Sequence, residues 1–145
     1  MLLKNDETYL GRFINFVSGD PSALPAMCDS TLLLWLGKEP SQETRSSLVG
    51  SIVNADPLAV CIGGAGAAVL FEDLLRFLSK EETPRPMMTK LCEADLSEAV
   101  ADFLQATWPY EERMDSWKAY RVACVDADCE AVRSTVAATI AGTGE

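Results

Sequence analysis

The chain of 145 residues contains no histidine. This absence excludes serine–histidine–aspartate triads, cysteine–histidine pairs and zinc sites that use imidazole. The phosphate-binding Walker A pattern is missing as well, because Gly37-Lys38 is followed by Glu39 where serine or threonine is required. We therefore predict no catalytic residue, no metal-binding residue and no cofactor; whether the chain is an enzyme stays open, and a non-catalytic role is favoured.

Basic residues are scarce. The sequence has 12 Lys and Arg against 22 Asp and Glu, which gives a net charge of −10 at pH 7. This charge repels phosphate backbones and anionic lipid surfaces, so we expect no nucleic acid partner and no membrane partner. A basic protein partner is compatible with it.

Long apolar segments are also missing. The longest uncharged run, 57–71, is interrupted by glycines and is shorter than the ~18 residues that a membrane span needs. Charged residues from Lys4 onward leave no room for the apolar segment of a signal peptide. We therefore expect the protein to be cytoplasmic.

The cysteines number five, an odd count that argues against a framework of disulfides. Cys61, Cys92 and Cys124 lie inside or at the ends of apolar runs, as buried cysteines in a reducing compartment do. Cys124 and Cys129 are too widely spaced for a Cys-x-x-Cys redox motif. We expect all of the cysteines to be structural.

Short apolar runs alternate with amphipathic segments along most of the chain. The expected elements are a helix over 6–17, strands over 31–36, 58–62, 87–92 and 117–125, and helices that begin near Ser41, Ala67, Asp95 and Asp126 or Asp128. Lys118 and Arg121 indicate that the last strand lies at an edge of the sheet.

This order predicts an α/β fold, a three-layer α/β/α sandwich with a mostly parallel sheet of about four strands, Rossmann-like or flavodoxin-like. The residues 1–145 would form a single domain, with an N-terminal helix and loop over 1–30 and a frayed tail over 141–145.

A glycine-rich turn joins the second expected strand to its helix. Gly64 and Gly66 match the first two glycines of a dinucleotide-binding fingerprint, but Val69 occupies the third position. Backbone N–H groups at the start of the helix could hold a phosphate, and Glu93 could reach a ribose. We name Gly63, Gly64, Gly66 and Glu93 as a candidate nucleotide or phosphate site; the alternative is a tight turn without a ligand.

Pairs of acidic residues follow the third and fourth expected strands: Glu93 with Asp95, and Asp126 with Asp128. If these strands were neighbours, the four carboxylates could hold Mg²⁺. Capping of the following helices explains both pairs without a metal, and we favour that interpretation.

The segment 108–117 combines large aromatic residues with acidic ones, a mixture that is typical of protein contacts. It could equally fold down as a lid over a sheet edge. Our leading hypothesis is a non-catalytic module that binds a basic protein, as an inhibitor or an antitoxin-like binder would. The expected contact residues are Trp108, Tyr110, Glu111, Glu112, Asp115 and Trp117. The alternative is a Rossmann-like domain that binds a nucleotide or phosphorylated small molecule at the glycine-rich turn.

Overall fold

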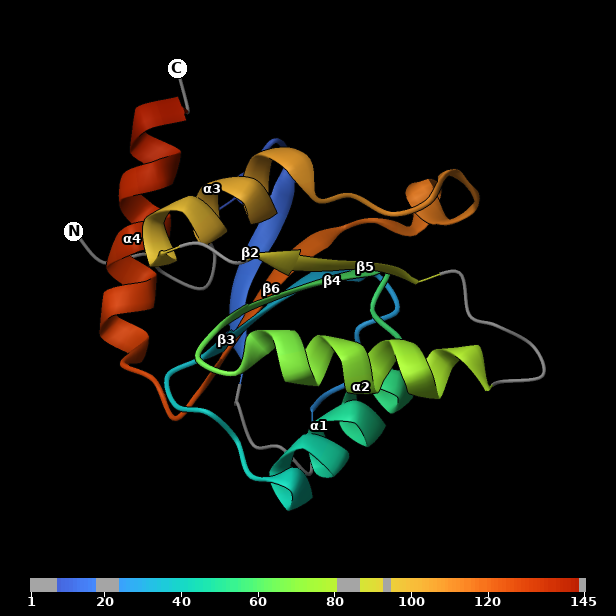
Figure 1. Ribbon diagram of the computed structural model, residues 1–145. Coiled ribbons are helices and arrows are strands. Elements are labelled where there is room, and N and C mark those ends of the chain that lie inside the picture. The colour runs from blue at the N-terminus through green and yellow to red at the C-terminus, as the bar shows by residue number, and fades with distance from the viewer. Residues whose placement is uncertain (1–7, 18–23, 81–86, 93–94, 144–145) are drawn as a thin grey trace.

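The computed structural model of the protein describes residues 8–17, 24–80, 87–92 and 95–143. These residues form a six-stranded sheet with helices on both of its faces (Figure 1). In chain order the elements are β1 (Thr8–Tyr9), β2 (Arg12–Val17), β3 (Ser30–Leu36), α1 (Gln42–Ala55), β4 (Ala59–Gly64), α2 (Ala67–Ser79), β5 (Met88–Cys92), α3 (Leu96–Ala106), the 3-10 helix η1 (Glu111–Ser116), β6 (Ala119–Val125) and α4 (Cys129–Thr143).

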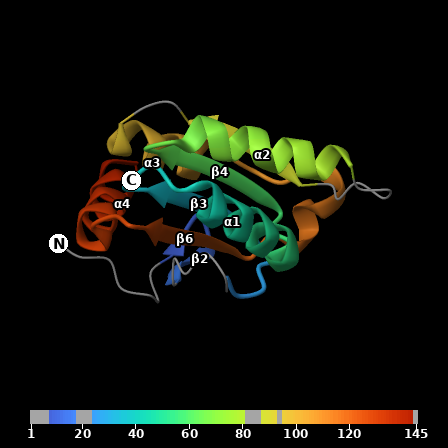
Figure 2. The ribbon, with the colours of Figure 1, turned by 60° about the horizontal axis from the view of Figure 1, so that its bottom comes forward.

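The strands lie in the order β1-β2-β6-β3-β4-β5, and all neighbouring pairs except β1 with β2 are parallel. Helices α1 and α2 cover one face of the sheet, and α3 and α4 cover the other (Figures 1 and 2). A separate buried hydrophobic cluster fills the space on each face. The α/β class and the mostly parallel sheet are therefore confirmed, with six strands instead of four.

The helix expected over 6–17 is wrong over 8–17, the part of it that the structure describes, because β1 and β2 form an antiparallel hairpin there. Leu10 and Gly11 are both in the left-handed region, with φ of 53° and 81°, and they join Tyr9 to its partner Arg12. Positive φ at both turn positions matches the right-handed twist of a hairpin and is incompatible with a continuous helix. The β-branched and aromatic residues of β2 then pair with β6.

The last strand, β6, lies inside the sheet between β2 and β3, so the expected edge position is also wrong. Arg121 is on the same face of the sheet as Ala123, because alternate residues of a strand share a face. Its Nε donates to the Ser30 hydroxyl at 3.2 Å, and its guanidinium lies 4.0 Å from Asp29. A half-buried and paired arginine is thus compatible with an interior strand.

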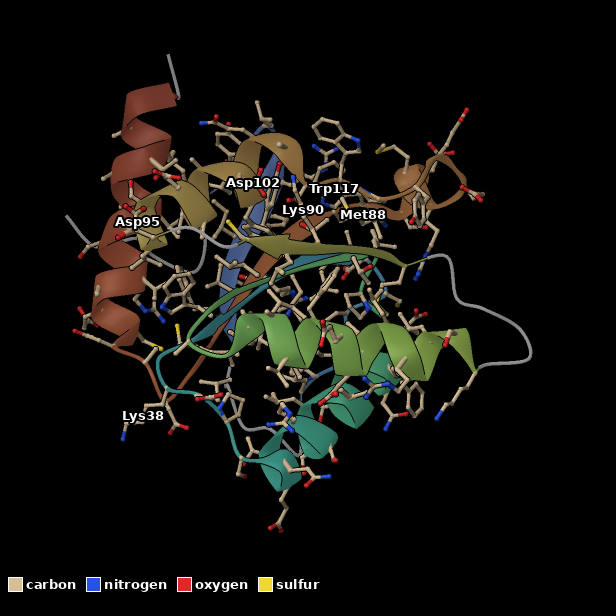
Figure 3. The ribbon with its side chains drawn as sticks, in the orientation of Figure 1. Lys38, Met88, Lys90, Asp95, Asp102 and Trp117 are labelled. Atoms are coloured by element: carbon tan, nitrogen blue, oxygen red, sulfur yellow. The ribbon has the colours of Figure 1, made fainter. Side chains whose placement is uncertain are left out.

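A charged residue is satisfied in the same way on β5. The Nζ of Lys90 donates to Asp102 at 2.9 Å and to the carbonyl of Ala106 at 3.0 Å (Figure 3). These two bonds attach the C-terminal half of α3 to the sheet.

Three of the helices begin with a side-chain cap. Ser41 accepts from the backbone N–H of Thr44, Asp95 from that of Glu98, and Asp128 from that of Glu130. Each such cap satisfies one of the unpaired donors at a helix start. The capping explanation for Asp95 and Asp128 is therefore confirmed. Helix α2 differs, because its N-cap residue is Gly66, which has no side chain to act as a cap.

The chain reverses its path across the sheet after β5. From β3 through β4 to β5 it moves stepwise toward one edge with α1 and α2 on one face, and it then returns over the opposite face through α3 to β6. The neighbours β4 and β5 therefore send their following helices to opposite faces. In open α/β sheets such a switch point is where a crevice opens at the carboxyl ends of the strands.

Helix α4 continues to Thr143, beyond the residue at which the tail was expected to begin. Among the described helices, none has the length and apolar character that crossing a membrane would require.

Candidate functional site

A cavity of about 690 Å³ lies at the switch point between β4 and β5. Its floor is the glycine-rich turn, with Gly64 and Gly66, and one wall is the start of α2, with Ala67 and Ala68. The opposite wall comes from the end of β5 and the start of α3, and Trp35 of β3 completes the lining. Two of the predicted glycines thus lie in the cavity.

The turn itself requires glycine. Gly64 has φ of 97°, and a Cβ there would overlap the carbonyl oxygen of Leu36 and lie 2.8 Å from its nitrogen. Gly66 has φ of 74°, and a Cβ there would lie 2.9 Å from Cγ of Glu39. Close approach of the end of β3 to Gly64 and of the β3–α1 loop to Gly66 therefore explains both glycines structurally, whether or not a ligand binds.

The start of α2 presents free backbone donors to the cavity. The first backbone bond of this helix runs from the N–H of Leu70 to the carbonyl of Gly66, at 3.3 Å. The N–H groups of Ala67, Ala68 and Val69 precede it and have no partner within the helix. The first turn carries no acidic residue and no side-chain cap. No side chain of the first turn therefore offsets the positive end of the helix dipole, and the nearest acidic residue on the β3–α1 loop, Glu39, lies close to Gly66.

The α3 side of the cavity offers few polar groups that are available to a ligand. The Asp95 carboxylate already accepts from the N–H of Glu98 at 2.9 Å, at the start of the helix in Figure 3. Cys92 is buried. Lys38, at the end of the neighbouring β3, is exposed and extends away from the body of the protein (Figure 3). The cavity is thus built mainly from backbone and apolar groups.

Trp35 is a lining residue that sequence reasoning missed. The sheet register places it opposite Gly63 on one side and Cys124 on the other. A Cβ at Gly63 would lie 2.9 Å from Cζ3 of Trp35, so the glycine makes room for the indole ring. The sequence shows a tryptophan near the end of a buried strand, and this was the one signal that could have pointed to Trp35. Its position opposite Gly63 follows only from the register of the sheet.

The remaining sequence-based candidates do not gather at this site. Gly63 lies within β4 beneath Trp35 and does not line the cavity. Glu93 lies outside the described residues. Because β3 and β4 separate β5 from β6, the two strands are not neighbours, so the condition for a shared Mg²⁺ site is not met. Within the described ranges, no cluster of three or more potential metal-binding side chains occurs.

The aromatic and acidic segment 108–117 lies at the opposite end of the sheet, where η1 leads into the start of β6 (Figure 1). Trp108 is 51% exposed and Tyr110 is 47% exposed. Glu111, Glu112 and Asp115 are exposed on η1 beside them. These five residues form what we call the aromatic–acidic surface.

Two further residues hold this segment against the protein. Arg113 donates to the Asp56 carboxylate at 3.2 Å and to the Asp56 carbonyl at 3.3 Å, which ties η1 to the end of α1. Trp117 packs edge-on against Tyr120, with ring centroids 5.4 Å apart, and the Arg12 guanidinium lies 3.7 Å above its ring. Trp117 is therefore part of the packed interior and is only half-exposed.

Two buried thiols are held in the protonated form. Loss of hydration on burial, together with nearby Cys92 and Asp102, raises the pKa of Cys61 from 9.0 to about 12. Burial, together with the neighbouring Cys129 thiol, also raises the pKa of Cys124 from 9.0 to about 12. A thiol that stays protonated at neutral pH is a poor nucleophile, which agrees with structural roles for these two residues.

No protein-family model, curated protein or solved structure matches the chain. Functional inference therefore depends on the geometry of the two candidate sites alone.

Proposed function

We propose that the protein binds a small phosphorylated molecule, such as a nucleotide, in the cavity between β4 and β5, as a Rossmann-like domain does. The observation that carries this proposal is the uncapped start of α2, whose free N–H groups line a cavity at a sheet switch point. Oriented backbone donors and the helix dipole together favour a phosphate group at such a position.

The other lining groups suit the remainder of such a ligand. The half-buried indole of Trp35 offers an aromatic surface, against which a base or another flat apolar group can pack. The glycines let a ligand approach the backbone closely, because no Cβ intervenes. The described lining contains the already engaged carboxylate of Asp95 and the buried thiol of Cys92. This set of groups favours binding over catalysis.

A charge introduced at Ala68 tests the proposal. Ala68 is exposed in the first turn of α2 and lines the cavity. The substitution Ala68→Glu places a carboxylate where the phosphate would lie, and it also favours the helix through the dipole, so the fold is expected to persist. We expect the affinity for pyrophosphate and AMP, measured by isothermal titration calorimetry, to fall by about tenfold or more.

Ala131→Glu is the matched control. Ala131 is an exposed alanine in the first turn of α4 and does not line the cavity, so the same charge change should leave binding intact. Failure of the unsubstituted protein to bind either probe, or equal binding by the Ala68→Glu protein, would overturn the proposal.

The aromatic–acidic surface favours a second function, docking of a basic protein. Trp108 and Tyr110 are large, exposed and amphipathic, as residues at the centres of protein contacts often are. The ion pair of Arg113 with Asp56 holds η1 in place, so binding would not have to order this segment. The adjacent carboxylates would steer a positively charged partner toward it.

Neutralising the three acidic residues tests this second function. We expect the combined variant Glu111→Gln, Glu112→Gln, Asp115→Asn to bind at least about tenfold more weakly to a partner identified by native mass spectrometry of the protein from its own cells. The salt dependence of binding should also flatten. A control with Glu43, Glu72 and Glu130 changed to glutamine removes the same charge from exposed positions elsewhere. If both variants lose affinity equally, only the net charge matters and the surface is not a specific site.

A further inference from the structure

A second pocket, of about 530 Å³, lies between helices α1 and α2, which run side by side on one face of the sheet (Figure 2). It shares no lining residue with the cavity between β4 and β5. Residues three and four apart share a face of a helix. The lining follows this spacing, with Arg45 and Val49 from α1 and with Asp73, Arg76 and Phe77 from α2. We call this site the interhelical pocket.

The carboxylate of Asp73 holds two arginines together in this pocket. Its Oδ2 accepts from Nε of Arg45 at 2.8 Å, and its Oδ1 accepts from Nη1 of Arg76 at 3.2 Å. Nη1 of Arg45 also donates to the carbonyl of Pro40 at 3.2 Å. The two guanidinium groups are therefore placed near each other before any ligand binds, which lowers the entropy that binding costs.

The charge of the pocket favours an anion. Its lining contains two arginines and one aspartate, and its other polar residues, Gln42 and Ser46, are uncharged, so a positive charge remains. The side chain of Arg76 is 62% exposed, and Asp73 is its hydrogen-bonding partner among the described residues. The remaining N–H groups of its planar guanidinium can bind a carboxylate. The rest of the protein repels anions, because the net charge of the chain is −10.

The other lining residues offer apolar surface and open space. Phe77 is 43% exposed, and its ring lies in the lining with the buried Val49. Gly50 also lines the pocket, and a Cβ there would meet nothing within 4 Å. An apolar group attached to the anion can therefore pack against Phe77 and occupy the space beside Gly50.

We propose that the interhelical pocket binds a small carboxylate that carries an apolar group, such as an aromatic acid. Arg76 and Arg45 receive the carboxylate, and the apolar group packs against Phe77. A single negative charge suits the pocket better than a doubly charged group, because Asp73 offsets one of the two arginines. This proposal does not depend on ligand binding in the cavity between β4 and β5.

Phenylacetate and its uncharged analogue phenylacetamide test the proposal on the unsubstituted protein. We expect phenylacetate to bind at least about tenfold more tightly in isothermal titration calorimetry, because only the acid can form charged hydrogen bonds with the arginines. In heteronuclear NMR spectra, the backbone amide signals that shift should be those of α1 and α2 around the pocket. Absence of phenylacetate binding, equal affinity for the amide, or shifts confined to other elements would overturn the proposal.

Two variants test the charge and the space separately. Arg76→Gln should weaken phenylacetate binding by about tenfold, whereas Lys38→Gln, which removes a positive charge from an exposed residue outside the pocket, should not. Gly50→Leu should abolish binding, because leucine favours the helix but its side chain would fill the pocket. Equal losses in Arg76→Gln and Lys38→Gln, or unchanged binding in Gly50→Leu, would contradict the proposed site. The comparison of acid with amide needs no substitution, so it remains decisive if a variant fails to fold.

Discussion

Replacing Gly64 with alanine is expected to lower the free energy of unfolding by about 3 kcal/mol. Two costs combine at this residue. An L side chain is strained at φ of 97°, and its Cβ would overlap the carbonyl oxygen of Leu36 in the neighbouring strand. The atoms that the new Cβ would meet are backbone atoms of Leu36, which is paired with Gly64 in the sheet, so they cannot easily move away. Urea denaturation of the two proteins measures the difference.

Gly50→Ala is the matched control, with an effect of opposite sign. Gly50 lies inside α1, and a Cβ there would meet nothing within 4 Å. Alanine should therefore raise the stability by about 0.5–1 kcal/mol, because it reduces the freedom of the unfolded chain. A loss of less than about 1 kcal/mol for Gly64→Ala would contradict the tight packing of this turn.

This expectation changes how the glycine-rich turn has to be tested. A bulky residue at Gly64 would damage the turn as well as any ligand site, so loss of binding would not be informative. Ala68 avoids the problem, because it is exposed and already carries a Cβ.

Replacing Phe103 with alanine is expected to cost about 3–5 kcal/mol. Phe103 is fully buried between α3 and the sheet. Its ring packs edge-on against Tyr120, with centroids 5.8 Å apart and planes at 79°. The substitution removes apolar contacts on that face and leaves a cavity among side chains that cannot collapse into it. Thermal and urea denaturation should both report the loss.

Phe77→Ala removes the same atoms from an exposed position and serves as its control. Phe77 is 43% exposed on α2, so the expected cost is below about 1 kcal/mol. Similar losses for the two variants would show that the core on the α3 and α4 face is not close-packed around Phe103.

Much of the fold is predictable from local pattern. The apolar runs of β3 and β4 and the stripe of Leu96, Val100 and Phe103 on α3 each reflect burial that is visible in a single segment. The pairing of strands cannot be read from a single segment. The expected position of β6 is wrong because Arg121 finds its partners at Ser30, the first residue of β3, and at the preceding Asp29, which are both distant in sequence. The hairpin of β1 and β2 is missed because helical and strand spacing both fit so short an apolar segment.

The residues of the candidate sites also fall into two groups: those that the sequence reveals and those that only the tertiary structure reveals. Gly64 and Gly66 are recognisable because a turn between a strand and a helix demands glycine in a short stretch of sequence. Trp35 and Ala68 are not recognisable, because they become lining residues only when β3 and α2 meet at the switch point. Likewise Trp108 and Tyr110 are exposed as expected, whereas Trp117 turns inward toward Tyr120.

The sequence by itself determined the α/β class, most helices and strands, the caps at Ser41 and Asp95, and the exclusion of histidine chemistry, because each follows from neighbouring residues or from composition. Only the tertiary structure decided the strand order, and the strand order in turn decided which residues meet at the candidate site. It opened a cavity between β4 and β5 and separated the strand ends that the two acidic pairs follow. The physical reason is that strand order depends on the summed packing of both sheet faces, and no single segment carries that information.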